Sequence, residues 1–283
     1  MDHFYIITSE LKDPGFAVAE KIRAYLLDRG RTCIIQTSPH DMPAARSRYT
    51  DFRRVPAETE CVIVLGGDGS LIRASRDLFG LSIPIVGINL GTLGYLTEGT
   101  RENALSVVEE LVEERFIIEE RMMISGRVLR GGTVLYQDVA LNEVVVTRNT
   151  VSMMYFDVMV GDLRLNSFAA DGIILSTPTG STAYNLSAGG PIVEPSASLF
   201  VLTPIAPHTM NNRSIILSPE DRIRIVLLSG KRIDPRPVVS FDGDQEISLQ
   251  AGDEIEITRA MQTTRIINLS RVSFLENLSR KMS

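Results

Sequence analysis

The chain has 283 residues and a formal net charge of −6, and 44% of its residues are hydrophobic. This length and apolar content predict a soluble globular protein with one large or two moderate domains. The acidic balance gives no basic surface of the kind that binds nucleic acid. The N-terminus lacks a basic leader, and no apolar run approaches about 18 residues. We therefore expect neither a signal peptide nor a membrane span, and we expect a cytoplasmic protein.

The basic residues and cysteines limit the chemistry further. The 29 basic residues include few lysines, and none lies between Lys21 and Lys231. Phosphate bound in that stretch would have to be neutralised by a metal ion, by arginine or by backbone N–H groups. Cys33 and Cys61 each lie in an apolar, strand-like run. This placement favours free thiols in a reducing compartment over a disulfide.

Residues 1–120 alternate between strand and helix patterns. Short apolar runs predict strands at residues 3–8, 32–37, 61–65 and 83–89. Apolar residues at helical spacing predict helices at residues 14–29, 70–79 and 101–115. Residues 38–60 are polar and without a clear period, which indicates a surface loop. This alternation is typical of an α/β domain, with a parallel sheet covered by helices.

Residues 121–261 change to a β-rich pattern. Successive short apolar runs predict strands, and Gly131-Gly132 and Gly161-Asp162 lie where hairpin turns are expected. One of these runs, residues 139–147, holds a polar pair in its interior. We predict an all-β, sandwich-like domain. The tail, residues 262–283, combines a strand pattern at 264–269 with a short amphipathic helix at 274–281. It could return to the first domain, which periodicity does not decide.

The most informative motif follows the strand predicted at residues 61–65. It reads Gly66-Gly67-Asp68-Gly69-Ser70 and opens directly into a helical pattern. Glycines let the backbone approach a ligand, and the free N–H groups at a helix start favour phosphate. A carboxylate there suits metal binding or proton abstraction during phosphoryl transfer. Asp-Gly is also ordinary turn chemistry, but three glycines between a strand and a helix favour a functional loop. The Walker and Rossmann glycine spacings are both missing.

Four other segments are candidates for a binding site. Residues 89–95 form a second glycine loop after the next strand, where α/β sheets bind ligands. Residues 171–191 combine hydroxyls, small residues and glycines, which suits ribose and base recognition or a plain loop. Asn142-Glu143 either lies on the exposed face of an edge strand or projects into a cleft, where it would bind a ribose diol or metal-bound water. Residues 241–245 favour a β-turn over a metal loop.

Taken in order, residues 66–70, 89–96, 142–143, 171–191 and 242–245 resemble the motifs of the NAD kinase (ATP-NAD kinase) family and span most of the chain. The block at residues 177–191 is highly specific. Gly-Gly-Asp-Gly alone is shared with diacylglycerol and sphingosine kinases and resembles a phosphofructokinase motif. The resemblance implies an N-terminal α/β nucleotide domain, a C-terminal β-sandwich-like domain and a homo-oligomer, either a tetramer or a dimer.

The resemblance also implies roles for the matching residues. Asp68 would be the general base that accepts the proton of the adenosine-ribose 2′-hydroxyl of NAD, while magnesium bridges the phosphates of ATP. Asn142 and Glu143 would hold the ribose and phosphate region of the substrate, and Asp171 its nicotinamide end. The other nucleotide contacts would be Gly67, Gly69, Arg73 and Asn89 from the first domain, and Thr182, Ala183, Tyr184, Asn185, Ser187 and Gln245 from the second. The chain departs from many relatives at Ala169 and Met153, where basic residues are often found.

The sequence thus predicts a magnesium-dependent kinase that acts on NAD and ATP and produces NADP, without nucleic-acid or membrane partners. Two alternatives stay open. One is a lipid kinase of the diacylglycerol type, which shares the Gly-Gly-Asp-Gly loop. The other is a non-catalytic NAD(P) sensor on the same fold. The hydroxyl-rich residues 176–187 suit a nucleoside better than a lipid, and the intact Asp68 argues against a sensor.

Overall fold

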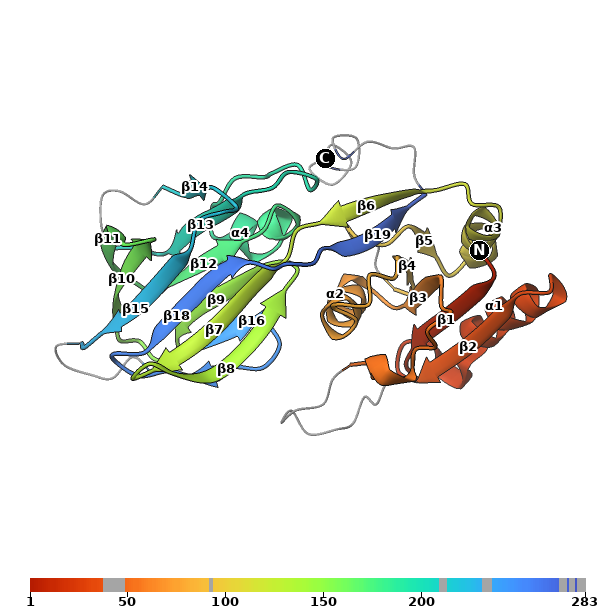
Figure 1. Cartoon of the computed structure of the whole chain (residues 1–283), viewed down its shortest axis with the longest axis horizontal. Helices are drawn as coiled ribbons and strands as arrows, with labels where there is room; N and C mark the ends of the chain where they lie inside the picture. Colours follow the sequence, from red (N-terminus) through yellow and green to blue (C-terminus); the bar gives the residue numbers. More distant parts are fainter. Residues whose placement is uncertain are drawn as a thin grey trace. The chain divides into compact units, whose positions relative to one another are not determined.

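The computed structural model describes residues 1–37, 49–91, 94–208, 213–230 and 236–269, together with residues 274 and 278. The chain divides into two compact units (Figure 1). The first, the α/β unit, comprises Met1–Arg121 and the described residues from Gln262 onward. The second, the β unit, comprises Met122–Met261.

A mainly parallel sheet, sheet 1, forms the centre of the α/β unit. Its strand order in the described residues is β2-β1-β3-β4-β19-β6, with β5 also beside β4. Neighbouring strands run parallel, except that β6 is antiparallel to β19. The strands are β1 (His3–Thr8), β2 (Thr32–Thr37), β3 (Cys61–Leu65), β4 (Ile85–Asn89), β5 (Gly99–Thr100), β6 (Ile117–Arg121) and β19 (Thr264–Asn268). The tail of the chain therefore adds a strand to the sheet of the first unit.

Helices cover both faces of sheet 1. Ile6 and Ile63 share an apolar cluster with buried residues of α1 (Ala17–Asp28) and α3 (Ala104–Val112), which places these two helices on one face. On the other face, Leu71 of α2 (Asp68–Asp77) packs against Gly87, where a Cβ would lie 2.7 Å from the leucine Cδ1. Because both faces are covered, β3 and β4 are buried at every residue. Two short 3-10 helices, η1 (Pro14–Phe16) and η2 (Phe52–Arg54), complete the unit.

Two antiparallel sheets make up the β unit. In the described residues, sheet 2 has the order β11-β10-β15-β18-β7-β8, and sheet 3 has the order β14-β13-β12-β9-β16-β17. Sheet 2 contains β7 (Ile124–Arg130), β8 (Thr133–Ala140), β10 (Met154–Val160), β11 (Leu163–Ala170), β15 (Ile223–Leu228) and β18 (Glu254–Arg259). Sheet 3 contains β9 (Glu143–Arg148), β12 (Gly172–Ser176), β13 (Phe200–Ile205), β14 (Ile215–Leu217), β16 (Pro237–Phe241) and β17 (Ile247–Ser248), and the helices η3 (Thr179–Thr182) and α4 (Tyr184–Ser187) follow β12.

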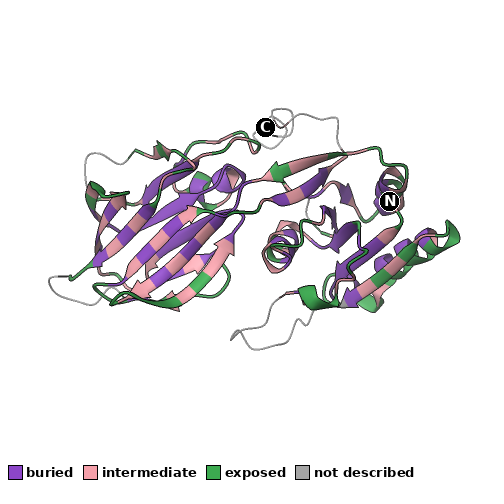
Figure 2. Ribbon diagram, in the orientation of Figure 1, coloured by how far each residue is buried: buried purple, intermediate pink, exposed green. Residues whose placement is uncertain are grey.

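One apolar core joins sheets 2 and 3. Its buried side chains come from both sheets. The ring of Phe241 in sheet 3 lies 5.8 Å from that of Tyr136 in sheet 2. A Cβ on Gly126 of β7 would lie only 2.6 Å from Phe241, so the sheets approach closely there. Buried and half-buried residues alternate along β7, β10 and β15 (Figure 2), as expected for strands with one face on the core.

The structure confirms the predicted fold class, an α/β unit followed by an all-β sandwich, but it corrects individual elements. Residues 139–147 are not one strand, because the chain leaves sheet 2 after Ala140 and enters sheet 3 at Glu143. Helix α1 begins only at Ala17, since Gly15 and Phe16 have positive φ angles of 64° and 52°. Strand β13 was not predicted. The helix predicted at residues 274–281 lies outside the described residues, except for positions 274 and 278, which are helical. Residues 38–48 of the expected loop also lie outside them.

Candidate functional site

The Gly-Gly-Asp-Gly loop lies at the carboxyl edge of sheet 1. Strand β3 ends at Leu65, and Gly67 is the N-cap of α2, so Asp68 is the first helical residue. Strand β4 lies parallel to β3, with Leu65 in register with Ile88. The loops that follow the two strands therefore emerge side by side at this edge, which is where α/β sheets bind ligands. The first N–H groups of α2 make this loop a place for an anion.

The second glycine loop holds the Asp68 carboxylate. Its Oδ2 accepts a hydrogen bond from the backbone N–H of Tyr95 at 2.5 Å, and its Oδ1 accepts one from the N–H of Leu96 at 3.0 Å. Gly94 lies against the same group, because a Cβ there would be 1.9 Å from Oδ1. The Asp68 carboxylate belongs to the Gly-Gly-Asp-Gly loop, but the second glycine loop fixes its orientation. Gly94 was absent from the predicted site residues, although its loop was singled out.

The other predicted residues of the α/β unit differ in accessibility. Gly69 is exposed at the start of α2 and has room around it. Arg73 is also exposed, with its guanidinium carbon 6.0 Å from the ring centre of Tyr49. Asn89 is buried at the end of β4, where its Oδ1 accepts a hydrogen bond from the N–H of Gly91 at 2.7 Å. Asn89 therefore shapes the second glycine loop.

In the β unit, Asn142 and Glu143 lie where the chain crosses from sheet 2 to sheet 3. The link between β8 and β9 is Leu141-Asn142, and Glu143 is the first residue of β9. The prediction of a polar pair inside a strand was therefore wrong. The backbone N–H groups of residues 141, 142 and 143 all donate to the carboxylate of Asp242, at 2.8, 2.7 and 3.1 Å. This anion makes the abrupt crossing possible.

The side chains of this pair are buried without partners. Asn142 is 8% exposed and Glu143 6% exposed. Asn142 Oδ1 and Glu143 Oε2 are buried atoms with no hydrogen bond. Burial, together with the charge of Asp242, raises the pKa of Glu143 to about 8. Buried polar atoms are rarely left unpaired, so a bound water or a ligand would complete the hydrogen bonding of these two.

Asp242 stands in the turn that sequence analysis preferred at residues 241–245. It follows β16, and both Asp242 and Gly243 have positive φ angles, 51° and 65°. Gln245, a predicted contact, is exposed three residues further on. Sequence reasoning missed the role of Asp242, since its partners lie about 100 positions earlier in the chain.

The hydroxyl-rich block forms a tightly bonded loop after β12. The Asn185 amide donates to the carbonyls of Ser181 and Pro191, at 3.1 and 3.0 Å, and accepts from Thr203 at 2.7 Å. Asn185 is fully buried, so these contacts indicate a positioning role rather than the predicted contact with substrate. Tyr184, by contrast, is 43% exposed. The remaining predicted contacts in this block are open or half-open to solvent: Thr182, Ala183 and Ser187.

Asp171 lies at the opposite end of sheet 3 from the Asn142-Glu143 pair. In the pairing of β12 with β9, Ser176 stands opposite Glu143, whereas Gly172 stands opposite Thr147. The Arg148 guanidinium, which donates two hydrogen bonds of 2.8 Å to Asp171, lowers the pKa of that carboxyl. Five residues of strand at about 3.4 Å each separate Asp171 from Glu143 by roughly 17 Å. The structure therefore does not bring these two predicted contacts together within one chain.

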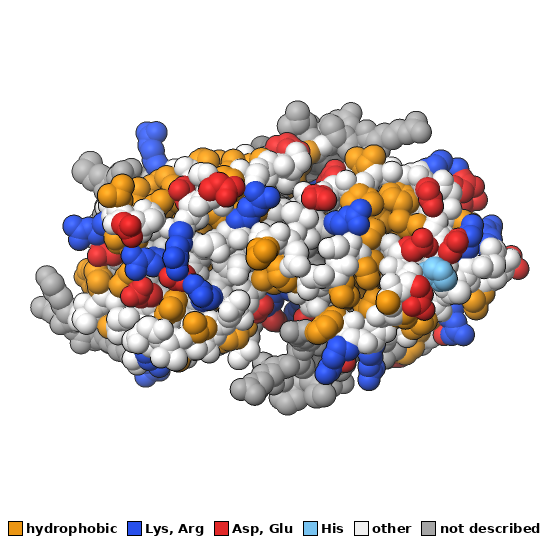
Figure 3. Space-filling model, in the orientation of Figure 1, with side chains coloured by type: hydrophobic (Ala, Val, Ile, Leu, Met, Phe, Trp, Pro, Cys, Tyr) orange, Lys and Arg blue, Asp and Glu red, His pale blue; other side chains and the backbone are white. Residues whose placement is uncertain are grey.

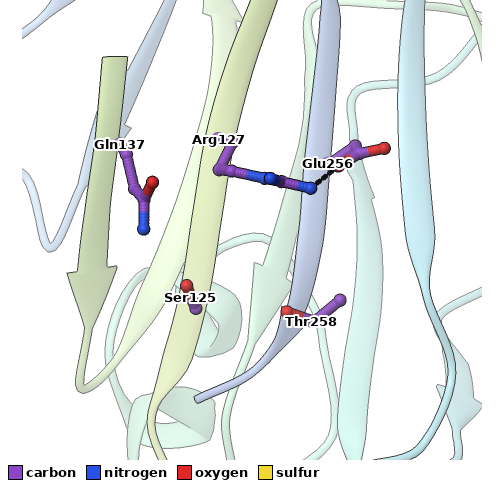
Figure 4. A pocket seen from close by; sticks show the side chains of 5 residues that line it. All are labelled: Ser125, Arg127, Gln137, Glu256 and Thr258. Atoms are coloured by element: carbon purple, nitrogen blue, oxygen red, sulfur yellow. Dashed lines mark hydrogen bonds and ion pairs between the residues drawn. The ribbon is translucent and has the colours of Figure 1, made fainter. Parts of the chain in front are cut away.

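The outer face of sheet 2 carries a separate polar pocket of about 220 Å³ (Figure 4). Arg127 donates to Glu256 at 2.5 Å, and Arg222 pairs with the same carboxylate at 2.6 Å. Basic and acidic side chains lie interleaved over this face (Figure 3). None of the predicted site residues lines the pocket, whose walls are Ser125, Arg127, Gln137, Glu256 and Thr258.

The described residues show neither a cluster of metal-ligating side chains nor a helix that could cross a membrane. No group of three or more His, Cys, Asp or Glu side chains in the described ranges has the arrangement of a metal site. Each helix in this part of the chain is too short or too polar to cross a bilayer.

Comparison with known proteins bears directly on these motifs. Residues 15–116 match the model of the ATP-NAD kinase N-terminal domain, and residues 141–269 match that of the C-terminal domain. The chain is 42% identical to an NAD kinase of Lachnospira eligens, with all of both chains covered. The fold is similar to that of yeast NADH kinase complexed with NADH (TM-score 0.84, 23% identity, 100% of this chain and 87% of that one). It is also similar to that of an NAD kinase from Archaeoglobus fulgidus in complex with ATP (TM-score 0.74, 23% identity, 98% of each). The chain belongs to the ATP-NAD kinase family.

Proposed function

We propose that this protein transfers the γ-phosphoryl group of ATP to the 2′-hydroxyl of the adenosine ribose of NAD, which yields NADP, and that Asp68 is the general base. The observation that carries the proposal is the Asp68 carboxylate, which lies at the N-terminus of α2 and is oriented by two N–H groups of the neighbouring loop. Family membership supports the reaction. The two similar solved structures, one complexed with NADH and the other with ATP, support the substrate classes.

Catalysis would depend on positioning and charge neutralisation. The exposed N–H groups at Gly69 and the start of α2 would bind phosphate, with Arg73 on the same helix. The phosphoryl donor would be the magnesium complex of ATP, in which the metal neutralises phosphate charge. Asp68, as the carboxylate of the loop, would accept the proton of the attacking hydroxyl. A fixed orientation matters because small misplacements of a catalytic group are costly.

The β unit would hold NAD. Asn142 and Glu143 offer buried atoms that lack partners, which suits the hydroxyl groups of a ribose. Tyr184 is exposed enough to stack on a flat ring, and Thr182, Ala183 and Ser187 would line the nucleoside pocket around it. Gln245 would add a further contact. We infer that Asn185 supports this pocket from within.

We also propose a cytoplasmic homo-oligomer, a tetramer or a dimer. Cys33 and Cys61 are unpaired, as expected in a reducing compartment. Family membership supports the oligomer. Light scattering coupled to size-exclusion chromatography tests the assembly, and a monomer that is fully active at the same concentration would contradict it.

A coupled assay for NADP formation tests the reaction. The purified chain is incubated with NAD, ATP and magnesium, beside an Asp68→Asn variant that keeps the size of the side chain but cannot take the proton. We expect NADP with the unmodified chain, nearly complete loss of turnover in the variant, and NAD binding by calorimetry in both. A variant with near-normal turnover would refute the role of Asp68. NAD binding without NADP, with ATP or with polyphosphate as donor, would point to a sensor instead.

A further inference from the structure

The link between sheets 2 and 3 has every backbone polar group paired. The three N–H groups of residues 141–143 donate to Asp242. The carbonyl of Leu141 accepts from the Thr177 hydroxyl at 2.6 Å, and that of Asn142 accepts from the Thr177 N–H at 2.8 Å. The carbonyl of Glu143 accepts from the N–H of Asp242 at 3.0 Å. The backbone of the link is therefore held in one arrangement before any ligand binds.

The side chains of the same link, in contrast to its backbone, have polar atoms without hydrogen-bond partners. Asn142 Oδ1 and Glu143 Oε2 are buried and have no hydrogen-bond partner, although the backbone that carries them is saturated. A Cβ on Gly180 would lie 2.2 Å from the Asn142 carbonyl oxygen, so the neighbouring loop also packs tightly against the link. A rigid backbone with unpaired side-chain atoms is the arrangement expected of a preorganised binding site.

We propose that Asp242 is a positioning residue for the substrate site, which fixes the link that presents Asn142 and Glu143 through three hydrogen bonds to its backbone. The inference rests on the proposed function, since it takes these two side chains as contacts of NAD. Asp242 itself needs to touch no substrate. Its effect passes through the three hydrogen bonds to the link.

The surroundings of Glu143 support the protonated form. Burial is the larger cause of the raised pKa of Glu143, and the charge of Asp242, from the turn after β16, raises it further. The strand on the other side, β12, places Ser176 opposite Glu143 and so contributes a hydroxyl rather than a charge. The Asp242 carboxylate is stabilised as an anion by three N–H donors. Two neighbouring carboxyl groups avoid double ionisation, and the group without donors is the one that keeps its proton.

This arrangement specifies the chemistry of the ligand group. The Asn142 oxygen requires a donor, and a protonated Glu143 offers a donor of its own. Two adjacent hydroxyl groups would pair with both side chains, because one can donate to the Asn142 oxygen while the other accepts from protonated Glu143. The two side chains thus suit a ribose diol, which is the group that the proposed function places there.

Three variants test the positioning role. Asp242→Asn removes the charge and one acceptor atom, and Glu143→Gln removes the titrating proton. Asp253→Asn is the matched control, because Asp253 is a buried carboxylate of the same unit that accepts from a backbone N–H at Gln250 and from Arg130. For Asp242→Asn we expect about a tenfold rise in the KM for NAD with kcat within about threefold, and no comparable change for Asp253→Asn.

The ionisation of Glu143 is measured separately, by following the side-chain carboxyl resonances of protein labelled with ¹³C-glutamate between pH 4 and pH 10. The resonance missing in Glu143→Gln identifies the residue. We expect its titration near pH 8 in the unmodified chain and at a lower pH in Asp242→Asn, where burial still raises the pKa but the charge of Asp242 does not. A titration of Glu143 below pH 5 in the unmodified chain would refute the protonated form of Glu143, whether or not Asp242→Asn folds. Equal effects of Asp242→Asn and Asp253→Asn on the KM for NAD would overturn the proposal.

The kinase reaction and the role of Asp242 are tested by different measurements. If the unmodified chain makes no NADP, the proposed function fails, and the carboxyl titration still decides whether Asp242 controls Glu143. If NADP is formed but Asp242→Asn and Asp253→Asn change the KM for NAD equally, the kinase stands and the role of Asp242 falls.

Discussion

The buried carboxyl of Glu143 makes the stability of the protein depend on pH in a way that one substitution should remove. Glu143 is 6% exposed, and its neighbour Asp242 is an anion. Burial and this charge raise the pKa of Glu143 from 4.5 to about 8 in the folded chain. The unfolded chain has neither effect. Glu143→Gln replaces the neutral acid by a neutral group of nearly the same shape.

The direction of the pH dependence of stability follows from the protons bound by the folded and unfolded chains. Between pH 4.5 and about pH 8 the folded chain keeps the Glu143 proton and the unfolded chain releases it. The contribution of this group to stability is therefore fully present below pH 4.5 and is lost as the pH rises towards 8. The loss amounts to about 1.4 kcal/mol per pH unit, which over about 3.5 units sets an upper limit of about 5 kcal/mol. Relaxation of the site would reduce this value.

The assay is denaturant unfolding of the full chain from pH 5 to pH 8, at one protein concentration. We expect the free energy of unfolding of the unmodified chain to fall relative to that of Glu143→Gln as the pH rises. Glu256→Gln is the control, because Arg222 and Arg127 outweigh burial and lower the pKa of Glu256, so that it is ionised in both states over this range. Parallel curves for Glu143→Gln and the unmodified chain would refute the reasoning, since they would mean that Glu143 is ionised when folded.

Three other predictions follow from single contacts. Gly94→Ala should lower kcat by about a hundredfold and leave NAD binding nearly unchanged, because the added Cβ displaces the Asp68 carboxylate. Steady-state kinetics and calorimetry measure the two effects, and an unchanged kcat would contradict the prediction. Tyr184→Ala should weaken NAD binding more than ATP binding, as measured by calorimetry, since the exposed ring is proposed to line the nucleoside pocket; equal losses would argue against that placement. Asp13→Ala should lower the free energy of unfolding by about 1–2 kcal/mol, because the Asp13 carboxylate accepts hydrogen bonds from the N–H groups of Val18 and Ala19 at the start of α1. A loss within error of zero in denaturant unfolding would show that water replaces these two hydrogen bonds.

The sequence by itself determined the elements whose pattern is local. The apolar runs at residues 3–8, 32–37 and 61–65 coincide with β1, β2 and β3, because strands buried on both faces are continuous apolar segments. The same locality made the Asp68 loop recognisable, since its glycines, its carboxylate and the start of α2 are contiguous. The two-domain fold class and the family were therefore available from the sequence.

Tertiary structure alone decided the contacts between distant segments. Nothing local in residues 139–147 marks the crossing between sheets, because the carboxylate that stabilises it is Asp242, about 100 positions away. Gly94 is required by the Asp68 side chain of another loop. Asn185 has the same polar character as Asn142, but the fold saturates the first and leaves an oxygen of the second unpaired. Burial and hydrogen-bond satisfaction depend on the groups that surround a side chain in space. Short-range sequence periodicity does not indicate which distant residues those groups belong to.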